Sequence, residues 1–169
     1  MSTWLLIIFL FLLVKGFKIA PFLPANKKDL PIINKVADLK PGQTFVELGA
    51  GDARVSTFIA KKNPNCKVIA IELSLPIFIF AKLKSIFGPT NLTIKYGDCL
   101  EYNLSNADVV YTYALIKTIN NKIKPKVIQE LNPNAKLISY VFSIKKWPYQ
   151  KFSVSNSKGY KLIHTYFMQ

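Results

Sequence analysis

The 169-residue sequence predicts an α/β fold built on a mostly parallel sheet that helices cover on both faces. Three observations support this prediction. Short runs that suit strands alternate with longer segments that suit helices. The strand runs are almost continuously apolar, as is typical of parallel strands buried on both faces. Two final strand-like runs, residues 152–155 and 160–167, flank Ser157, Lys158 and Gly159, which predict a closing antiparallel hairpin.

The individual elements follow one another from residue 26 onwards. Asn26 is expected to cap the first helix, with Asp29 three residues later in place of the usual Glu or Gln of a capping box. Pro31 falls early enough in that helix to be tolerated. Strands are expected over residues 44–48, 67–73, 92–96, 107–114 and 136–142. Helices are expected over residues 26–39, 53–62, 76–87 and 117–131, the last of them interrupted by Pro125.

The amino terminus carries the most hydrophobic stretch of the chain, because residues 4–14 read WLLIIFLFLLV. This run is shorter than the roughly 20 apolar residues of a full bilayer span. A secretory signal is disfavoured because no side-chain charge precedes the run and no small-x-small site follows it. We therefore expect an apolar helix in residues 1–20 that anchors the chain to a membrane through residues 1–18. The lysines after it predict that a single domain, residues 21–169, lies on the cytoplasmic side.

The chain is strongly basic, with 23 Lys and Arg against 9 Asp and Glu and a net charge of +14. Such a surface attracts nucleic acid, anionic lipid or an acidic protein. Nucleic acid is possible but not favoured, because Arg54 is the only arginine and arginine makes most planar contacts to bases and phosphates. Cys66, Cys99 and His164 lack the spacing of metal ligands, so we expect no metal site, two buried thiols and a histidine within a strand.

The most informative motif is VELGAGDARV, which follows the first strand and opens a helix. Gly49 and Gly51 permit a tight turn and a close approach of a ligand to the backbone. A nicotinamide site would need glycine where Arg54 stands. Glu47, two residues before the first glycine, instead suits a ligand that carries positive charge, such as the amino and sulfonium groups of S-adenosylmethionine (SAM).

Two further acidic residues come at the ends of the next two strands. Glu72 lies 21 residues after Gly51, the spacing at which a carboxylate accepts ribose hydroxyls in nucleotide-binding α/β folds. Asp98 ends the third strand, where SAM-dependent methyltransferases carry an acid that reads the adenine amino group. Because carboxyl ends of parallel strands meet at one edge, we expect Glu47, Glu72 and Asp98 to surround one SAM molecule.

Taken with a Pro-rich segment before the first helix, these motifs resemble a known family. The sequence is similar to small membrane-anchored class I methyltransferases, which include the mitochondrial protein-lysine methyltransferases that act on the ATP synthase c subunit and the adenine nucleotide translocase, and bacterial relatives. The resemblance covers about residues 21–148. Its landmarks are PFLPA at residues 21–25, VELGAGDARV, Asp98, ADVVY at residues 107–111 and KWP at residues 146–148.

The resemblance implies a Rossmann-like class I methyltransferase fold, SAM as cofactor and a protein lysine as acceptor. It adds Asp52 to the cofactor-binding residues and Pro24, Tyr113 and Trp147 as candidates for lining the acceptor site, although Tyr113 suits core packing equally well. No Asn/Asp-Pro-Pro-Tyr sequence follows the fourth strand, which disfavours methylation of adenine or glutamine amides. The family has glycine where this chain has Ala53. If residue 53 is helical, the added methyl group costs little, whereas a positive φ there would weaken SAM binding.

Three functions remain open at this point. The first is a SAM-dependent methyltransferase that modifies lysine on a membrane-associated protein. The second is a methyltransferase acting on RNA, lipid or a small molecule. The third is a SAM-binding module without activity.

Overall fold

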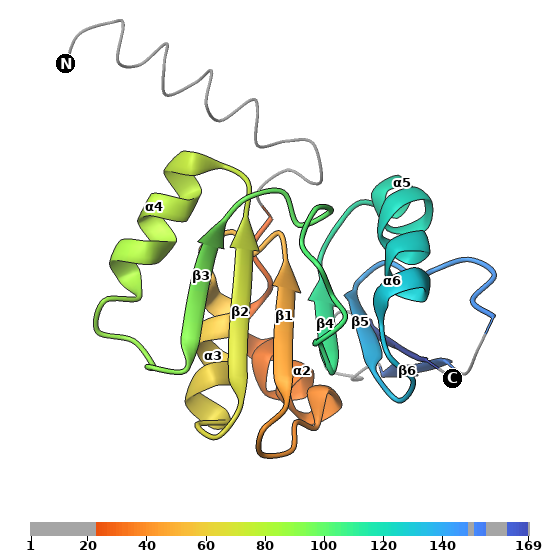
Figure 1. Cartoon of the computed structure of the whole chain (residues 1–169), viewed down its shortest axis with the longest axis horizontal. Coiled ribbons are helices and arrows are strands. Elements are labelled where there is room, and N and C mark those ends of the chain that lie inside the picture. Colours follow the sequence, from red (N-terminus) through yellow and green to blue (C-terminus); the bar gives the residue numbers. More distant parts are fainter. Residues whose placement is uncertain (1–22, 149–150, 155–161, 169) are drawn as a thin grey trace, which may run out of the picture.

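The computed structural model describes residues 23–148, 151–154 and 162–168. These residues form a seven-stranded sheet in the order β3-β2-β1-β4-β5-β7-β6 (Figure 1). β1 to β5 are mutually parallel, and β7 runs antiparallel between β5 and β6. The strands are β1 (Thr44–Leu48), β2 (Lys67–Glu72), β3 (Leu92–Tyr96), β4 (Val109–Thr112), β5 (Lys136–Tyr140), β6 (Lys151–Val154) and β7 (Ile163–Phe167).

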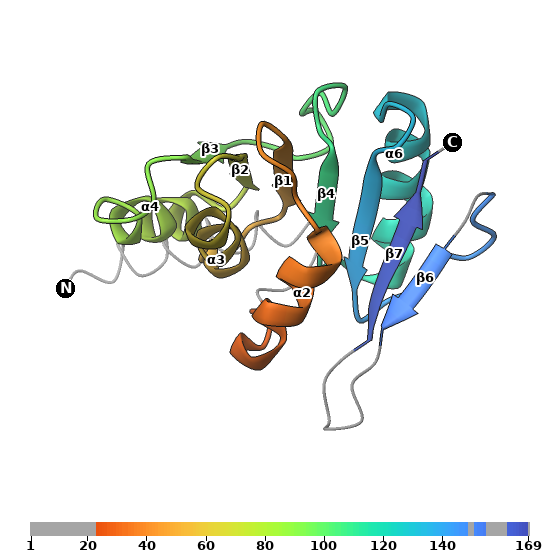
Figure 2. The same cartoon turned by 90° about the horizontal axis from the view of Figure 1, so that it is seen from below.

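Helices cover both faces of this sheet, as the continuous apolar strands predict. One face carries η2 (Lys27–Asp29), α2 (Leu30–Ala37), α3 (Arg54–Lys62) and α4 (Leu75–Lys84) (Figure 2). The other face carries α5 (Ile116–Thr118), the π-helical η3 (Ile119–Ile123) and α6 (Lys124–Glu130). The prediction of a mostly parallel α/β fold with a closing antiparallel pair is therefore confirmed.

Alternation along the strands builds two separate cores. In β1, Phe45 packs with α2 and α3, whereas Val46 and Leu48 pack with η3 and α6 on the opposite face. A smaller cluster of alanines, which includes Ala81, seats α4 against β2. Since successive strand side chains point to opposite faces, this register fixes which helices lie together.

The segment between β3 and β4 contains no helix. Cys99 and Leu104 from this loop are fully buried against the face that carries α5 and α6, and the Leu104 amide donates to Glu130 Oε2 at 2.9 Å. The helix from α5 to α6 widens into a π-helix just before Pro125, in agreement with the predicted interruption. Proline lacks an amide donor and its ring crowds the preceding turn, which explains the change in hydrogen bonding.

The predicted capping of the first helix by Asn26 is confirmed, but the reciprocal bond that would complete a capping box is not formed. The Asn26 side chain accepts from the Lys28 amide at 3.0 Å, as a cap should, but Asp29 does not bond back to the Asn26 amide. That amide donates to the Tyr140 hydroxyl at 3.3 Å, and the same hydroxyl donates to Asp29. Asp29 therefore connects η2 to the end of β5, which lies 111 residues away in the sequence.

The described residues confirm the predictions for the two cysteines and for His164. Cys66 and Cys99 are buried free thiols, and burial raises the pKa of Cys99 to about 12. His164 lies within β7 and is buried. In the three described ranges, no three His, Cys, Asp or Glu side chains are grouped to hold a metal ion. The same ranges contain no helix with the length and apolar character to cross a bilayer. The predicted anchor in residues 1–20 lies outside them.

Candidate active site

The glycine motif forms the loop between β1 and α3, at the point where the strand order reverses from β1-β2 to β1-β4. Ligands of open α/β folds bind at such a switch point. Gly49 and Gly51 have φ values of 76° and 57°, a left-handed conformation that favours glycine. The amides of Gly49 and Ala50 both donate to the Ile71 carbonyl, at 3.0 and 2.8 Å. A Cβ on Gly49 would meet no atom within 4 Å, so the loop leaves space for a ligand.

Glu72 ends β2 directly beside this loop. Its two carboxylate oxygens each accept one backbone hydrogen bond, from the Gly51 amide at 2.8 Å and the Ser74 amide at 2.7 Å. The side chain is 8% exposed. Because a carboxylate oxygen can accept two hydrogen bonds, each retains capacity for a ribose hydroxyl. The chemistry of this group therefore fits the nucleoside part of SAM.

Asp98 follows the end of β3, the neighbouring strand. The Gly97 amide donates to the Glu72 carbonyl at 3.1 Å, which holds the segment before Asp98 against the end of β2. Asp98 is partly exposed, and its Oδ1 accepts from the Leu100 amide at 2.9 Å. The structure thus brings Glu72 and Asp98 to the same edge of the sheet, as their positions at strand ends predict.

Glu47 is held differently from the other two acids. It is 4% exposed, and its Oε2 accepts from both the amide and the hydroxyl of Ser56, at 3.0 and 2.5 Å. Burial raises the pKa of Glu47 from 4.5 to about 8, although the Ser56 bonds oppose this shift. The native state therefore binds this proton more tightly than the unfolded chain does. The resulting stability is fully present below pH 4.5 and is lost as the pH rises through about 8.

Asp52 is the centre of an ionic cluster. Arg54 contacts both of its oxygens, through Nε at 2.9 Å and Nη2 at 3.0 Å, and Lys84 of α4 approaches Oδ2 at 3.0 Å. Burial acts to raise the pKa of Asp52, but the bonds from Arg54 and Lys84 outweigh it and leave the pKa below its ordinary value. The remaining Arg54 nitrogen, Nη1, donates to the Ala25 carbonyl at 3.2 Å. The cluster therefore ties the glycine loop to α4 and to the segment before η2.

Ala53 adopts the left-handed conformation, with φ 55° and ψ 28°. Residue 53 therefore has the positive φ for which weaker SAM binding is expected, and not the helical conformation. The methyl group is buried at 1% exposure. An alanine in this conformation costs roughly 1–2 kcal/mol relative to the right-handed one.

The three residues expected to line an acceptor site are not all together. Pro24 is exposed and precedes Ala25, which Arg54 holds. Tyr113 follows β4 on the same face of the sheet, where its ring lies edge-on to Tyr140 with centroids 4.8 Å apart. Trp147 packs against Tyr166 in the cluster on the opposite face, at 5.0 Å, and its Nε1 donates to the Phe167 carbonyl at 3.3 Å.

Sequence reasoning missed four side chains that organise this edge of the sheet. Ser56 holds Glu47, Lys84 holds Asp52, and the buried pair of Asp29 and Tyr140 holds Asn26. Ser56 and Lys84 have no sequence signal of their own, because each meets its partner from another element, and the sequence predicts Asp29 only as part of a helix cap. Only the buried strand position of Tyr140, whose hydroxyl must find a partner, points towards such a bond.

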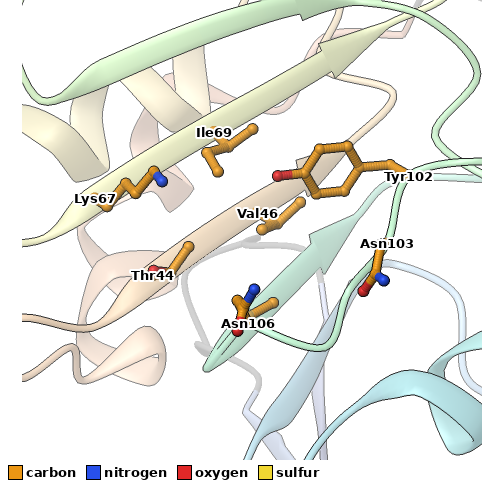
Figure 3. Close-up of a pocket in the computed structure, with 8 residues that line it drawn as sticks. Thr44, Val46, Lys67, Ile69, Tyr102, Asn103 and Asn106 are labelled. Atoms are coloured by element: carbon orange, nitrogen blue, oxygen red, sulfur yellow. The ribbon is translucent and has the colours of Figure 1, made fainter.

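A hollow lies at the opposite edge of the sheet, near the amino ends of β1 and β2 (Figure 3). Its volume is about 290 Å³, and Tyr102 reaches over it from the loop that replaces a helix between β3 and β4. Thr44 and Lys67, the first residues of their strands, form part of its wall. It is therefore separate from the carboxyl edge that carries the glycine loop.

Comparison with known proteins gives a family match. The sequence profile of the ANTKMT methyltransferase domain matches residues 47–151, more than half of the chain. A protein-lysine N-methyltransferase of Saccharolobus islandicus (strain REY15A) is 26% identical over 129 residues, which cover 75% of this chain and 80% of that protein.

Solved structures agree on the fold. The RNA methyltransferase from Salinibacter ruber, crystallised with S-adenosyl-L-homocysteine, superposes with a TM-score of 0.76 at 22% identity and covers 86% of this chain and 94% of its own. The precorrin-6y C5,15-methyltransferase of Geobacter metallireducens GS-15 gives 0.71 at 16% identity, over 88% and 92% of the two chains. At these identities the superpositions show the fold alone.

The parallel sheet, the glycine loop at its switch point and the acids on the following strand ends define a class I, SAM-dependent methyltransferase. SAM is the cofactor of this class. The open glycine loop fits SAM, and so does the Glu72 carboxylate, which can accept further hydrogen bonds. Since the domain profile covers most of the sheet and its site, the chain belongs to the ANTKMT methyltransferase family.

Proposed function

We propose that this methyltransferase transfers a methyl group from SAM to the side-chain amine of a lysine in a membrane-associated protein. The observation that carries the proposal is the match of residues 47–151 to the ANTKMT methyltransferase domain. The Saccharolobus relative, a protein-lysine N-methyltransferase by name, supports lysine as acceptor.

The proposal assigns a role to each residue at the carboxyl edge of the sheet. Glu72 accepts hydrogen bonds from the two ribose hydroxyls, and Asp98 accepts from the adenine amino group. Gly49 and Gly51 let the backbone approach the methionine part. The positive charge of that part would lower the pKa of the nearby Glu47 carboxyl and so favour the ionised form that pairs with it. Asp52 acts on the loop itself, because its carboxylate is already engaged by Arg54 and Lys84.

The cofactor supplies an electrophilic methyl group on a sulfonium, and the acceptor amine must reach it uncharged. A free lysine has a pKa of roughly 10.4, so the site must favour the neutral form. Tyr113 and Phe142, with ring centroids 6.3 Å apart after β4 and β5, supply apolar surface beside the cofactor edge. Such surroundings lower the pKa of an amine by desolvation, and holding it in line with the methyl group provides further acceleration.

The membrane part of the proposal rests on the sequence. Residues 1–18 anchor the chain, and the lysines that follow place the catalytic domain on the cytoplasmic side. An anchored enzyme meets membrane proteins at a high effective concentration, which suits an acceptor in the same bilayer.

The direct test is methyl transfer from radiolabelled SAM to the membrane and soluble fractions of the cells that produce this protein. We expect label in a membrane protein, and mass spectrometry should locate it on lysine. Label that is sensitive to nuclease or extracted with lipid would contradict the proposed acceptor while leaving the enzyme class intact. A folded chain that binds SAM but labels nothing would support the binding module instead.

Two variants make this test specific. In Glu72→Gln, the amide NH₂ group faces one of the two backbone N–H donors that the carboxylate now accepts from, and the contacts to the ribose hydroxyls are weakened. The Kd for SAM should therefore rise at least about tenfold. Glu101→Gln removes an exposed acid from the loop after β3 and serves as the matched control, with unchanged SAM binding. Removal of residues 1–18 should abolish labelling of the membrane target but not SAM binding. Thermal unfolding of the shortened chain checks that it is folded.

A further inference from the structure

The outer surface of α4 and the turn after it is unusually apolar. Five large hydrophobic side chains are exposed there: Ile79 at 47%, Phe80 at 58%, Leu83 at 61%, Ile86 at 64% and Phe87 at 98%. Single exposed hydrophobic residues are common on soluble domains, but a contiguous group of this size marks an interaction surface.

Positions 79 and 83, and positions 80 and 83, are four and three residues apart, which are intervals that put side chains on one face of α4. Ile86 and Phe87 extend this exposed apolar surface into the turn that follows Lys84, where α4 ends. On the opposite side of α4, Ala81 is 1% exposed and packs in the alanine cluster against β2. In Figure 1, α4 lies at the end of the sheet that is closed by β3, the outermost strand. We call the five exposed residues the α4 stripe.

The charges around the stripe have a single sign. No Asp or Glu occurs anywhere in residues 73–97, whereas Lys82, Lys84 and Lys95 lie in this segment. Lys84 is engaged with Asp52, and Lys82 is exposed beside the stripe. An exposed apolar surface that has lysine and no acidic residue beside it suits contact with an anionic membrane.

We propose that the α4 stripe lies in the headgroup region of a bilayer that contains anionic lipid. A second copy of the chain would also cover apolar surface, but each copy carries a net charge of +14, so two copies repel whereas an anionic surface attracts. This contact holds one end of the sheet at the membrane. It does not depend on the identity of the methyl acceptor.

The experiment uses the full chain with an environment-sensitive fluorophore on Phe87→Cys, the most exposed member of the stripe. Cys66 and Cys99 are buried, so the label reports the introduced thiol. The matched control is Asn121→Cys, an exposed position in η3, which packs on the opposite face of the sheet from α4. Both proteins are mixed with vesicles of phosphatidylcholine alone or with phosphatidylserine, each carrying a nitroxide on the acyl chain near the headgroup.

We expect the probe at position 87 to shift to the blue and to be quenched on vesicles that contain phosphatidylserine, while the probe at position 121 stays in water. Lys82→Glu should lower the ratio of docked to undocked probe about thirtyfold, because two charges change at roughly 1 kcal/mol each. Equal quenching at both positions would overturn the proposal. An apolar environment of the probe at position 87 in the absence of vesicles would also overturn the proposal. If that environment does not depend on protein concentration, residues 1–22 of the same chain cover the stripe. If it does depend on protein concentration, a second copy of the chain covers it.

Discussion

Tyr140→Phe tests the link between β5 and the segment before the first helix. The Tyr140 hydroxyl donates to Asp29 Oδ2 and accepts from the Asn26 amide. Asp29 is 0% exposed, and its other oxygen, Oδ1, has no hydrogen-bond partner within the described ranges. Removal of the hydroxyl therefore leaves a buried carboxyl group without its hydrogen bond.

The expected loss can be estimated from these contacts. A hydrogen bond to a charged group contributes about 1.5–3 kcal/mol, and the ring itself remains in place in the phenylalanine variant. We expect the free energy of unfolding to fall by about 2–3 kcal/mol. For a chain of this size, each kcal/mol corresponds to roughly 2–4 °C, so the Tm should fall by about 4–12 °C.

The assay is thermal unfolding of the full chain in mild detergent, followed by circular dichroism. Tyr113→Phe is the matched control, because this tyrosine packs edge-on against Tyr140 but its hydroxyl makes no hydrogen bond to any residue that the structure describes. The control should change the Tm by no more than about 2 °C. If Tyr140→Phe unfolds at the same temperature as the unmodified chain, Asp29 does not depend on this hydroxyl and the reasoning fails.

Three further changes test the glycine loop. Glu47→Gln should remove the loss of stability between pH 4.5 and about 8, seen as a flatter dependence of the urea midpoint on pH; an unchanged slope would refute the assigned pKa. Arg54→Lys cannot contact both Asp52 oxygens and Ala25 together, so protease cleavage before residue 26 should accelerate and stability should fall by about 1–2 kcal/mol. Ala53→Gly should raise the free energy of unfolding by less than about 1 kcal/mol, because relief of left-handed strain is opposed by greater freedom of the unfolded chain; Ala53→Val should lower it sharply.

Much of the fold could be predicted because its signals are local. The strands over residues 44–48 and 92–96 have the predicted bounds, since turn residues and apolar runs delimit them on both sides. The predicted helix over residues 76–87 is too long, because residues 85–88 continue as turns after α4 ends at Lys84. A local pattern of apolar residues does not distinguish a last helical turn from an apolar turn.

The only contacts of the site that could be predicted are those that follow from the order of the strands. Glu72 reaches the glycine loop because β2 is the parallel neighbour of β1, a consequence of topology. Ser56 meets Glu47 through the docking of α3, and Lys84 meets Asp52 through the docking of α4. These contacts depend on how helices seat on the sheet, which no spacing in the sequence encodes.

The ion pair of Asp52 and Arg54 has a structural role that could not be inferred from the family resemblance alone. Arg54 joins the loop that follows β1 to the Ala25 carbonyl, and Tyr140 holds the next amide, that of Asn26. Residues 25 and 26 are therefore fixed at two successive points, one on the cofactor loop and one at the end of β5. A membrane anchor in residues 1–18 would pull on this segment first. The two contacts would transmit the pull of such an anchor to the carboxyl edge of the sheet, where we propose that SAM and the acceptor meet. Loosening either contact should therefore uncouple this edge from the anchor before it disturbs the sheet.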